Sequence, residues 1–155
     1  MVPLAALKGC ALFKGFTDTG LQIIAGVAGM RTFPQGTPLF VENMVADSLL
    51  IVADGKVRLS TKNGKGAEVS VGEVGVGDAL GELSLIQPGQ RMCTATALGV
   101  VTAVEVRHAD FQKLLVQKPQ ACVKLLMAIV AQFGQKVMEN RETFRSLLDR
   151  EAAKH

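Results

Sequence analysis

The most informative stretch of the chain is Gly81-Glu82-Leu83-Ser84-Leu85-Ile86-Gln87-Pro88-Gly89-Gln90-Arg91-Met92-Cys93-Thr94-Ala95. A short helix is predicted from Glu82, and its first N–H groups would attract an anion. Gly81 has no Cβ, so a ligand can come close to the backbone there. Arg91 is the only cation between Lys65 and Arg107, and its planar guanidinium suits pairing with a phosphate. Glu82 can accept a hydrogen bond from a sugar hydroxyl. The stretch therefore predicts a site that binds a phosphate and a ribose.

The motif Gly-Glu-Leu-Ser-Leu, followed by an arginine and small residues, resembles the phosphate-binding cassette of cyclic-nucleotide-binding domains. This family includes catabolite activator protein, regulatory subunits of cyclic-AMP-dependent kinase and nucleotide-gated channels. In the family the glutamate binds the ribose 2′-hydroxyl and the arginine binds the cyclic phosphate. Amides of the short helix and the small residue two past the arginine complete the phosphate contacts. The resemblance assigns these roles to Glu82, Arg91, Gly81, Leu83, Ser84 and Cys93.

Two other interpretations of the cassette stay open. In the first, Glu82 and Arg91 merely pair with each other on a surface loop, an arrangement that is common and contributes little to stability. In the second, the family fold is kept and the ligand has been lost, so that the chain acts as a module for dimerisation or for protein interaction.

Short runs of apolar and β-branched residues, broken by glycine, surround the cassette, and Asp54-Gly55 is a strong hairpin signal. Seven or eight such strands indicate a sandwich or a roll. The resemblance implies an α+β fold, an eight-stranded antiparallel β-roll of jelly-roll type with N-terminal helices and a long C-terminal helix. We expect one domain, residues 1–155, divided into N-terminal helices (1–29), the β-roll (30–107) with its cassette (81–95), and C-terminal helices (108–155).

Composition indicates a globular protein in a reducing compartment. The chain has 155 residues, 48% hydrophobic and 20% charged, which suits a single packed domain. Its net charge of +3 is too small to indicate nucleic-acid binding by itself. Three widely spaced cysteines predict a reducing compartment without a disulfide framework. No signal peptide is evident, and the most apolar window, residues 125–130, is short for a membrane span. We therefore expect a cytoplasmic protein that does not enter a membrane.

A long helix is predicted from Pro119 to about Glu151. Its apolar positions approximate a coiled-coil seam with Asn140 on it, which predicts a parallel homodimer. The seam consists of Cys122, Leu126, Ile129, Phe133, Val137, Phe144 and Leu147. The alternative is a helix that packs only on its own barrel. In catabolite activator protein the matching helix forms the dimer interface and touches the base, so Phe133 is the candidate for a base-capping contact. The polar residues used there are replaced by Gln132, Lys136 and Val137.

The residue after the arginine bears on which nucleotide binds. In the family a threonine there is associated with cyclic GMP, because its hydroxyl can bond the guanine. Met92 has no hydroxyl, so we expect cyclic AMP as the ligand, with cyclic GMP less favoured and a cyclic dinucleotide still open. The two histidines, His108 and His155, are too few for a histidine-rich metal centre, and no nucleophile with a base is evident. We expect neither a metal nor enzyme activity.

Together these features predict a stand-alone cyclic-nucleotide sensor that signals through its C-terminal helix to an unidentified protein partner. A DNA-binding regulator of the catabolite-activator type is the main alternative. Only about five residues follow the predicted helix, so we expect no helix-turn-helix domain unless the sequence is a fragment. An enzyme on a similar roll, such as a metal cupin, is disfavoured by the histidine count.

Overall fold

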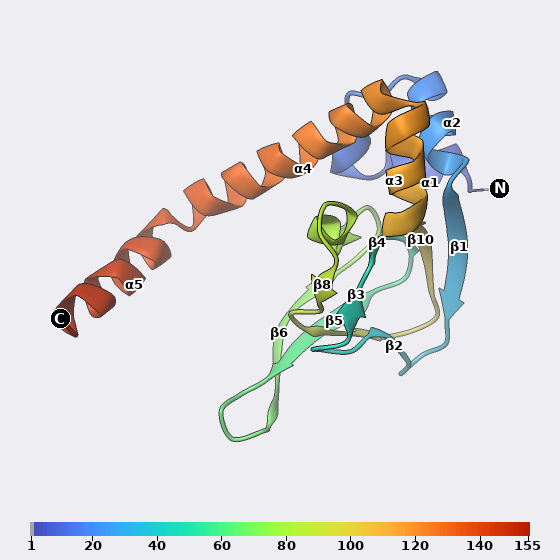
Figure 1. The fold of residues 1–155 in the computed structure, drawn as a ribbon. Coiled ribbons are helices and arrows are strands. Elements are labelled where there is room, and N and C mark those ends of the chain that lie inside the picture. The colour runs from blue at the N-terminus through green and yellow to red at the C-terminus, as the bar shows by residue number, and fades with distance from the viewer. Residues whose placement is uncertain (1) are drawn as a thin grey trace.

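The computed structural model describes residues 2–155, and in it a β-roll lies below a group of helices from both ends of the chain (Figure 1). The N-terminal part contains helix α1 (Leu4–Lys8), the 3-10 helix η1 (Ala11–Phe13) and helix α2 (Asp18–Ala25). Thr17 caps α2, since its Oγ1 accepts a hydrogen bond from the Gly20 N–H at 3.2 Å. The first strand begins at Ala28, slightly before the predicted end of the helical segment.

The strands form two four-stranded antiparallel sheets and one two-stranded ribbon. One sheet has the order β1-β10-β4-β7, the second has the order β2-β9-β5-β6, and the ribbon pairs β3 with β8. The strands are β1 (Ala28–Phe33), β2 (Pro38–Phe40), β3 (Val45–Ala46), β4 (Ser48–Asp54), β5 (Val57–Lys62), β6 (Glu68–Val74), β7 (Ala79–Leu80), β8 (Gly89–Gln90), β9 (Thr94–Ala97) and β10 (Val101–Arg107). The predicted α+β roll is confirmed. The structure has ten strands instead of the seven or eight expected, because β3, β7 and β8 are only two residues long, too short to leave a pattern in the sequence.

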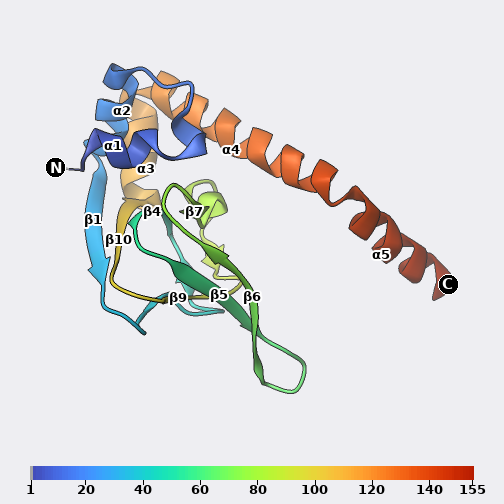
Figure 2. The same ribbon diagram turned by 180° about the vertical axis from the view of Figure 1, so that it is seen from behind.

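The first sheet is the middle layer of the domain (Figure 2). Alternate residues of a strand point to opposite faces, and here both faces are apolar. On β4, Leu49 and Ile51 face the helices, whereas Leu50 and Val52 face the interior of the roll. The continuous apolar run of β4 is explained by this double burial.

The C-terminal part consists of three helices, of which the last two extend away from the roll (Figure 1). They are α3 (His108–Gln117), α4 (Pro119–Glu139) and α5 (Arg141–Ala153). The predicted single helix to about Glu151 is wrong, because the helix breaks at Asn140, which has φ −104° and ψ 17°. The Asn140 Nδ2 donates to the Lys136 carbonyl at 2.7 Å, and such a local bond competes with the helical pattern. Asn140 therefore ends α4.

The predicted seam on this helix is also wrong in its first half. Cys122 and Ile129 are fully buried against the helices of their own domain, where α4 packs on η1, α2 and α3. Leu126 and Phe133 are half-buried on the same side. Cys122 and Ile129 cannot meet a second helix without leaving the core, so this stripe is the inner face of α4.

By length and composition, α4 is the one helix among the described residues that could cross a membrane. The apolar window of residues 125–130 was the only one considered in the sequence, whereas the apolar composition extends over more of this helix. Its apolar character has two parts: the inner face contributes Cys122, Leu125 and Ile129 to the core, and the outer face exposes further apolar side chains.

Candidate functional site

The cassette forms one wall of a cavity of about 450 Å³ that also reaches α4. Its central element is the 3-10 helix η2 (Glu82–Leu85), which follows β7. The structure brings together all eight residues predicted for the site. Gly81, Glu82, Leu83, Ser84, Arg91, Met92, Cys93 and Phe133 line this cavity.

Gly81 fits Arg91 closely and needs to be a glycine. It has φ +76°, a left-handed conformation that residues with a side chain rarely adopt. A Cβ at this position would overlap Nη1 of Arg91 and would lie 2.9 Å from the Ser48 carbonyl oxygen. The missing side chain thus leaves the space that the guanidinium occupies.

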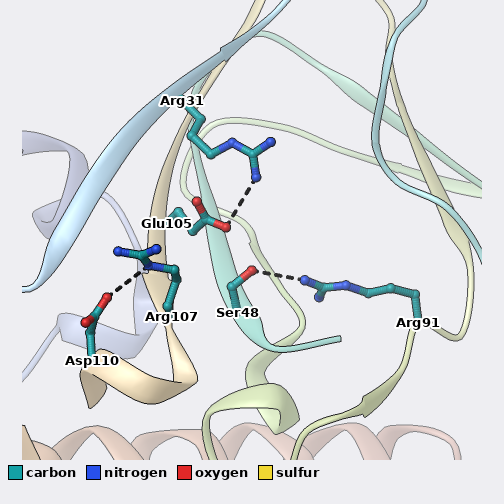
Figure 3. Close-up of polar contacts among 6 residues, drawn as sticks. All are labelled: Arg31, Ser48, Arg91, Glu105, Arg107 and Asp110. Atoms are coloured by element: carbon teal, nitrogen blue, oxygen red, sulfur yellow. Dashed lines mark hydrogen bonds and ion pairs between the residues drawn. The ribbon is translucent and has the colours of Figure 1, made fainter. Parts of the chain in front are cut away.

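Arg91 is buried with only 6% of its surface exposed, yet it makes few contacts with polar groups. Its Nη2 donates to Ser48 Oγ at 3.1 Å, and its guanidinium carbon lies 4.3 Å from the centre of the Phe40 ring. Within residues 2–155, its Nε and Nη1 are buried without a hydrogen-bond partner. Figure 3 shows the guanidinium directed at Ser48 while the carboxylate of Glu105 is bonded to Arg31 at 3.2 Å.

This environment leaves Arg91 without an ion-pair partner among the described residues. Burial lowers the pKa of the guanidinium from its ordinary value, and Asp47 and Glu105 partly offset that effect from a distance. None of the ion pairs among the described residues includes Arg91. An unpaired buried cation destabilises a fold unless a partner satisfies it. The two free donors and the positive charge fit an anion in the cavity.

Glu82 does not pair with Arg91, so the interpretation of these residues as a simple ion pair is wrong. Its carboxylate is 12% exposed and lies 4.0 Å from Nζ of Lys136, which α4 contributes. This ion pair is at the limit of the distance for a direct contact and leaves the acceptor capacity of the carboxylate largely free. Glu82 can therefore accept a hydrogen bond from a ligand hydroxyl.

The remaining predicted residues differ in the groups that they present to a ligand. The Ser84 amide donates to the Gly81 carbonyl at 3.0 Å, and its role toward a phosphate stays a prediction. Burial raises the pKa of the Cys93 thiol, which keeps it neutral near pH 7 and compatible with a neighbouring anion. Met92 is 87% exposed and Leu83 is half-exposed, whereas Phe133 is half-buried and comes from α4.

Two contributors to the site, Phe40 and Ser48, were missed in the sequence, and Lys136 was named only as a replacement for a polar residue of the family. Phe40 and Ser48 hold Arg91 from β2 and β4, and Lys136 lies beside Glu82. Phe40 and Ser48 lie in segments with the pattern of ordinary strands, and only the pairing of distant strands brings them to the arginine. Residues 2–155 contain no group of three or more His, Cys, Asp or Glu side chains that could hold a metal ion.

Comparisons with known proteins agree with this geometry. The family model described as "Cyclic nucleotide-binding domain" matches residues 30–118. The cyclic AMP receptor protein of Thermus thermophilus is 27% identical over 133 residues, which cover 86% of this chain and 62% of that protein. The chain thus spans about three fifths of the length of this curated relative.

Solved structures show the same fold. The N-terminal domain of a transcriptional regulator from Streptomyces coelicolor has a TM-score of 0.77 at 31% identity, over 84% of this chain and 92% of that one. The catabolite activator protein of Thermus thermophilus has a TM-score of 0.78 at 26% identity, over 88% of this chain and 62% of that one. The chain belongs to the cyclic nucleotide-binding domain family.

Proposed function

We propose that this chain binds cyclic AMP in the cassette cavity, with the cyclic phosphate at Arg91 and the ribose 2′-hydroxyl at Glu82. The observation that carries the proposal is the buried guanidinium of Arg91, whose Nε and Nη1 have no partner among the described residues. A cyclic phosphate is a compact anion whose oxygens can accept from such donors. Glu82 lies on the same cavity wall and can accept from the sugar.

The base is expected to contact the apolar part of the cavity. Phe133 offers an aromatic face from α4, and Leu83 and Met92 offer flexible apolar surface at the mouth. Met92 provides no hydroxyl for the exocyclic groups of guanine, which favours adenine. The names of the relatives, among them a cyclic AMP receptor protein, support the same choice.

Titration of the purified chain with cyclic AMP, cyclic GMP and cyclic di-GMP tests the proposal. We expect cyclic AMP to bind at least about tenfold more tightly than cyclic GMP, the discrimination that one lost hydrogen bond to a base provides. The 2′-deoxy analogue of cyclic AMP should bind more weakly than cyclic AMP, because Glu82 then has no hydroxyl to accept from. Absence of binding by all of these nucleotides would mean that the cassette has lost its ligand.

We further propose that the ligand signals through α4. Phe133 lines the cavity and Lys136 lies 4.0 Å from Glu82, so a nucleotide that contacts Phe133 or occupies Glu82 changes the groups that hold α4. Differential contact of this kind shifts the population of helix positions. Hydrogen exchange of α4 with and without nucleotide tests this, and identical exchange in the two states would argue against it. The receiving partner would contact α5, which has no buried residue.

The exposed side of α4 supports a homodimer through the C-terminal helices. Apolar or small residues recur there at steps of four, three, four and three, the spacing of a coiled-coil seam. The stripe consists of Val123, Met127, Val130, Gly134 and Val137, all exposed. It is displaced by one residue from most of the predicted seam and shares Val137 with it. A Cβ at Gly134 would meet no atom within 4 Å, so a second helix could approach closely.

Val130→Glu is expected to convert the dimer to a monomer, because it places a charge at the centre of the paired stripe. Val116→Glu is the matched control: Val116 is 85% exposed on α3, and Val130 is 64% exposed, so neither change disturbs the core. Light scattering after size exclusion measures the mass of each variant. A wild-type chain that is monomeric at high concentration, or a Val130→Glu dimer, would contradict the proposal.

A further inference from the structure

His108 is the first residue of α3, and it contacts two segments that flank the cavity. Its ring Nδ1 lies 2.9 Å from the Leu85 carbonyl oxygen at the end of η2. Its backbone N–H donates to the Asp47 carbonyl at 2.7 Å. One residue outside the cavity thus joins the cassette helix to the beginning of β4.

The contact with Leu85 satisfies a group that the short helix leaves free. The last carbonyls of a helix have no partner within it, and Leu85 itself is fully buried, away from water. A carbonyl oxygen can only accept, so Nδ1 of His108 carries the proton in this contact. The side chain of His108 thereby fixes the end of η2, whose first residue is Glu82.

The contact with Asp47 acts on the other wall of the site. Asp47 is followed by Ser48, which accepts from Nη2 of Arg91 at 3.1 Å. Ser48 also contributes the carbonyl that closes the space beside Gly81. The backbone of His108 is therefore linked to the side that holds the guanidinium, while its ring is linked to the side that holds Glu82.

We infer that His108 is a positioning residue of the nucleotide site, which sets the distance between the ribose acceptor Glu82 and the phosphate donor Arg91. The inference rests on the proposed function for its effect on ligand affinity, whereas the two contacts of His108 involve only atoms of this chain. A ligand that spans both groups binds tightly only when they are held at the right separation. His108 supplies that constraint from α3, the helix that precedes α4.

A matched pair of variants tests the inference. Asparagine and leucine have similar size, but the side-chain amide introduced by His108→Asn can place an N–H near the position of Nδ1, whereas the leucine of His108→Leu cannot. We expect His108→Leu to raise the Kd for cyclic AMP about tenfold, the size of effect that loss of an outer-shell hydrogen bond has at metal sites. His108→Asn should stay within about threefold of the wild type. Equal affinities of the two variants would overturn the inference.

Hydrogen exchange of the ligand-free protein gives a second measurement that does not depend on nucleotide binding. The amides of Ile86 and Gln87 donate to the Leu83 carbonyl at 3.0 and 2.9 Å, so they report whether η2 stays folded. These amides should exchange faster in His108→Leu than in His108→Asn or the wild type. If the wild type binds no nucleotide and this difference is still seen, the proposed function fails while the positioning role stands. Unchanged exchange in His108→Leu would reject the positioning role itself.

Discussion

Replacing Arg91 with methionine is expected to weaken cyclic AMP binding at least about 100-fold, because truncating one partner of a buried charge pair costs about 2–5 kcal/mol. The guanidinium has two donors without a partner within residues 2–155, and Arg91 is the one cation among the residues that line the cavity. Methionine keeps an apolar stem but provides neither charge nor N–H, and it loses the guanidinium that lies over the Phe40 ring. Calorimetric titration measures the loss.

The ligand-free Arg91→Met variant should be at least as stable to heat as the wild type. A buried cation without an ion pair opposes folding, and an apolar side chain that fills part of the same space removes that cost. Loss of affinity together with retained or increased thermal stability would separate a ligand-binding role of Arg91 from a structural one. A large drop in melting temperature would instead show that Arg91 serves the fold.

Arg58→Met is the control for this experiment. Arg58 lies on β5, outside the residues that line the cavity, and its Nε is also buried without a partner among the described residues. Both substitutions thus remove a guanidinium with at least one unpartnered buried nitrogen, although Arg58 is only half-buried, and they differ in their place relative to the cavity. Arg58→Met should leave the affinity for cyclic AMP unchanged. Equal losses in both variants would mean that the effect is not specific to the site.

The cassette could be predicted from the sequence because its function is local. Gly81, Glu82 and Arg91 lie within one short segment, and the chemistry of each residue type suggests its role. The support of Arg91 could not be predicted in this way. Ser48 is 43 positions from the arginine and reaches it through the pairing of β4 with β10 and β7, a tertiary arrangement that leaves no mark on Ser48 itself.

The prediction of which apolar stripe of α4 faces outward was wrong for a different physical reason. The first half of α4 is apolar on several faces, so two stripes with the same period compete for the role of outer face. Packing against η1, α2 and α3 decides between them by burying Cys122 and Ile129 and leaving Val123 and Val130 exposed. Periodicity predicts that such a helix has a buried face, but only the tertiary contacts determine which face is buried.

Gly81→Ala is expected to reduce cyclic AMP binding at least about 100-fold, a loss comparable to that of Arg91→Met, although it adds only a methyl group. The new Cβ would occupy the position of Nη1 of Arg91 and press on the Ser48 carbonyl, 2.9 Å away. Because the backbone atom cannot move far, the guanidinium must leave its place and lose the bond to Ser48 Oγ. Titration with cyclic AMP and thermal unfolding of the variant measure the two consequences.

Gly66→Ala separates the steric effect from the backbone effect. Gly66 has φ +77° and Gly81 has φ +76°, so alanine suffers the same left-handed strain of about 1–2 kcal/mol at either position. A Cβ at Gly66 would meet nothing within 4 Å. Both variants should therefore lose similar stability from strain, but only Gly81→Ala should lose affinity. Retained affinity in Gly81→Ala would mean that Arg91 can bind phosphate from another position.

A double variant identifies the atoms responsible for the loss of stability in Gly81→Ala that exceeds backbone strain. In an Arg91→Ala background no guanidinium remains to be displaced, so adding Gly81→Ala should destabilise the protein less than it does in the wild type. The new Cβ also presses on the Ser48 carbonyl in both backgrounds. In the Arg91→Ala background, this contact and the backbone strain are the remaining causes of lost stability. Groups in contact give non-additive changes in free energy, whereas independent groups give additive ones. Additive changes in this cycle would show that Gly81 and Arg91 do not share the space between them.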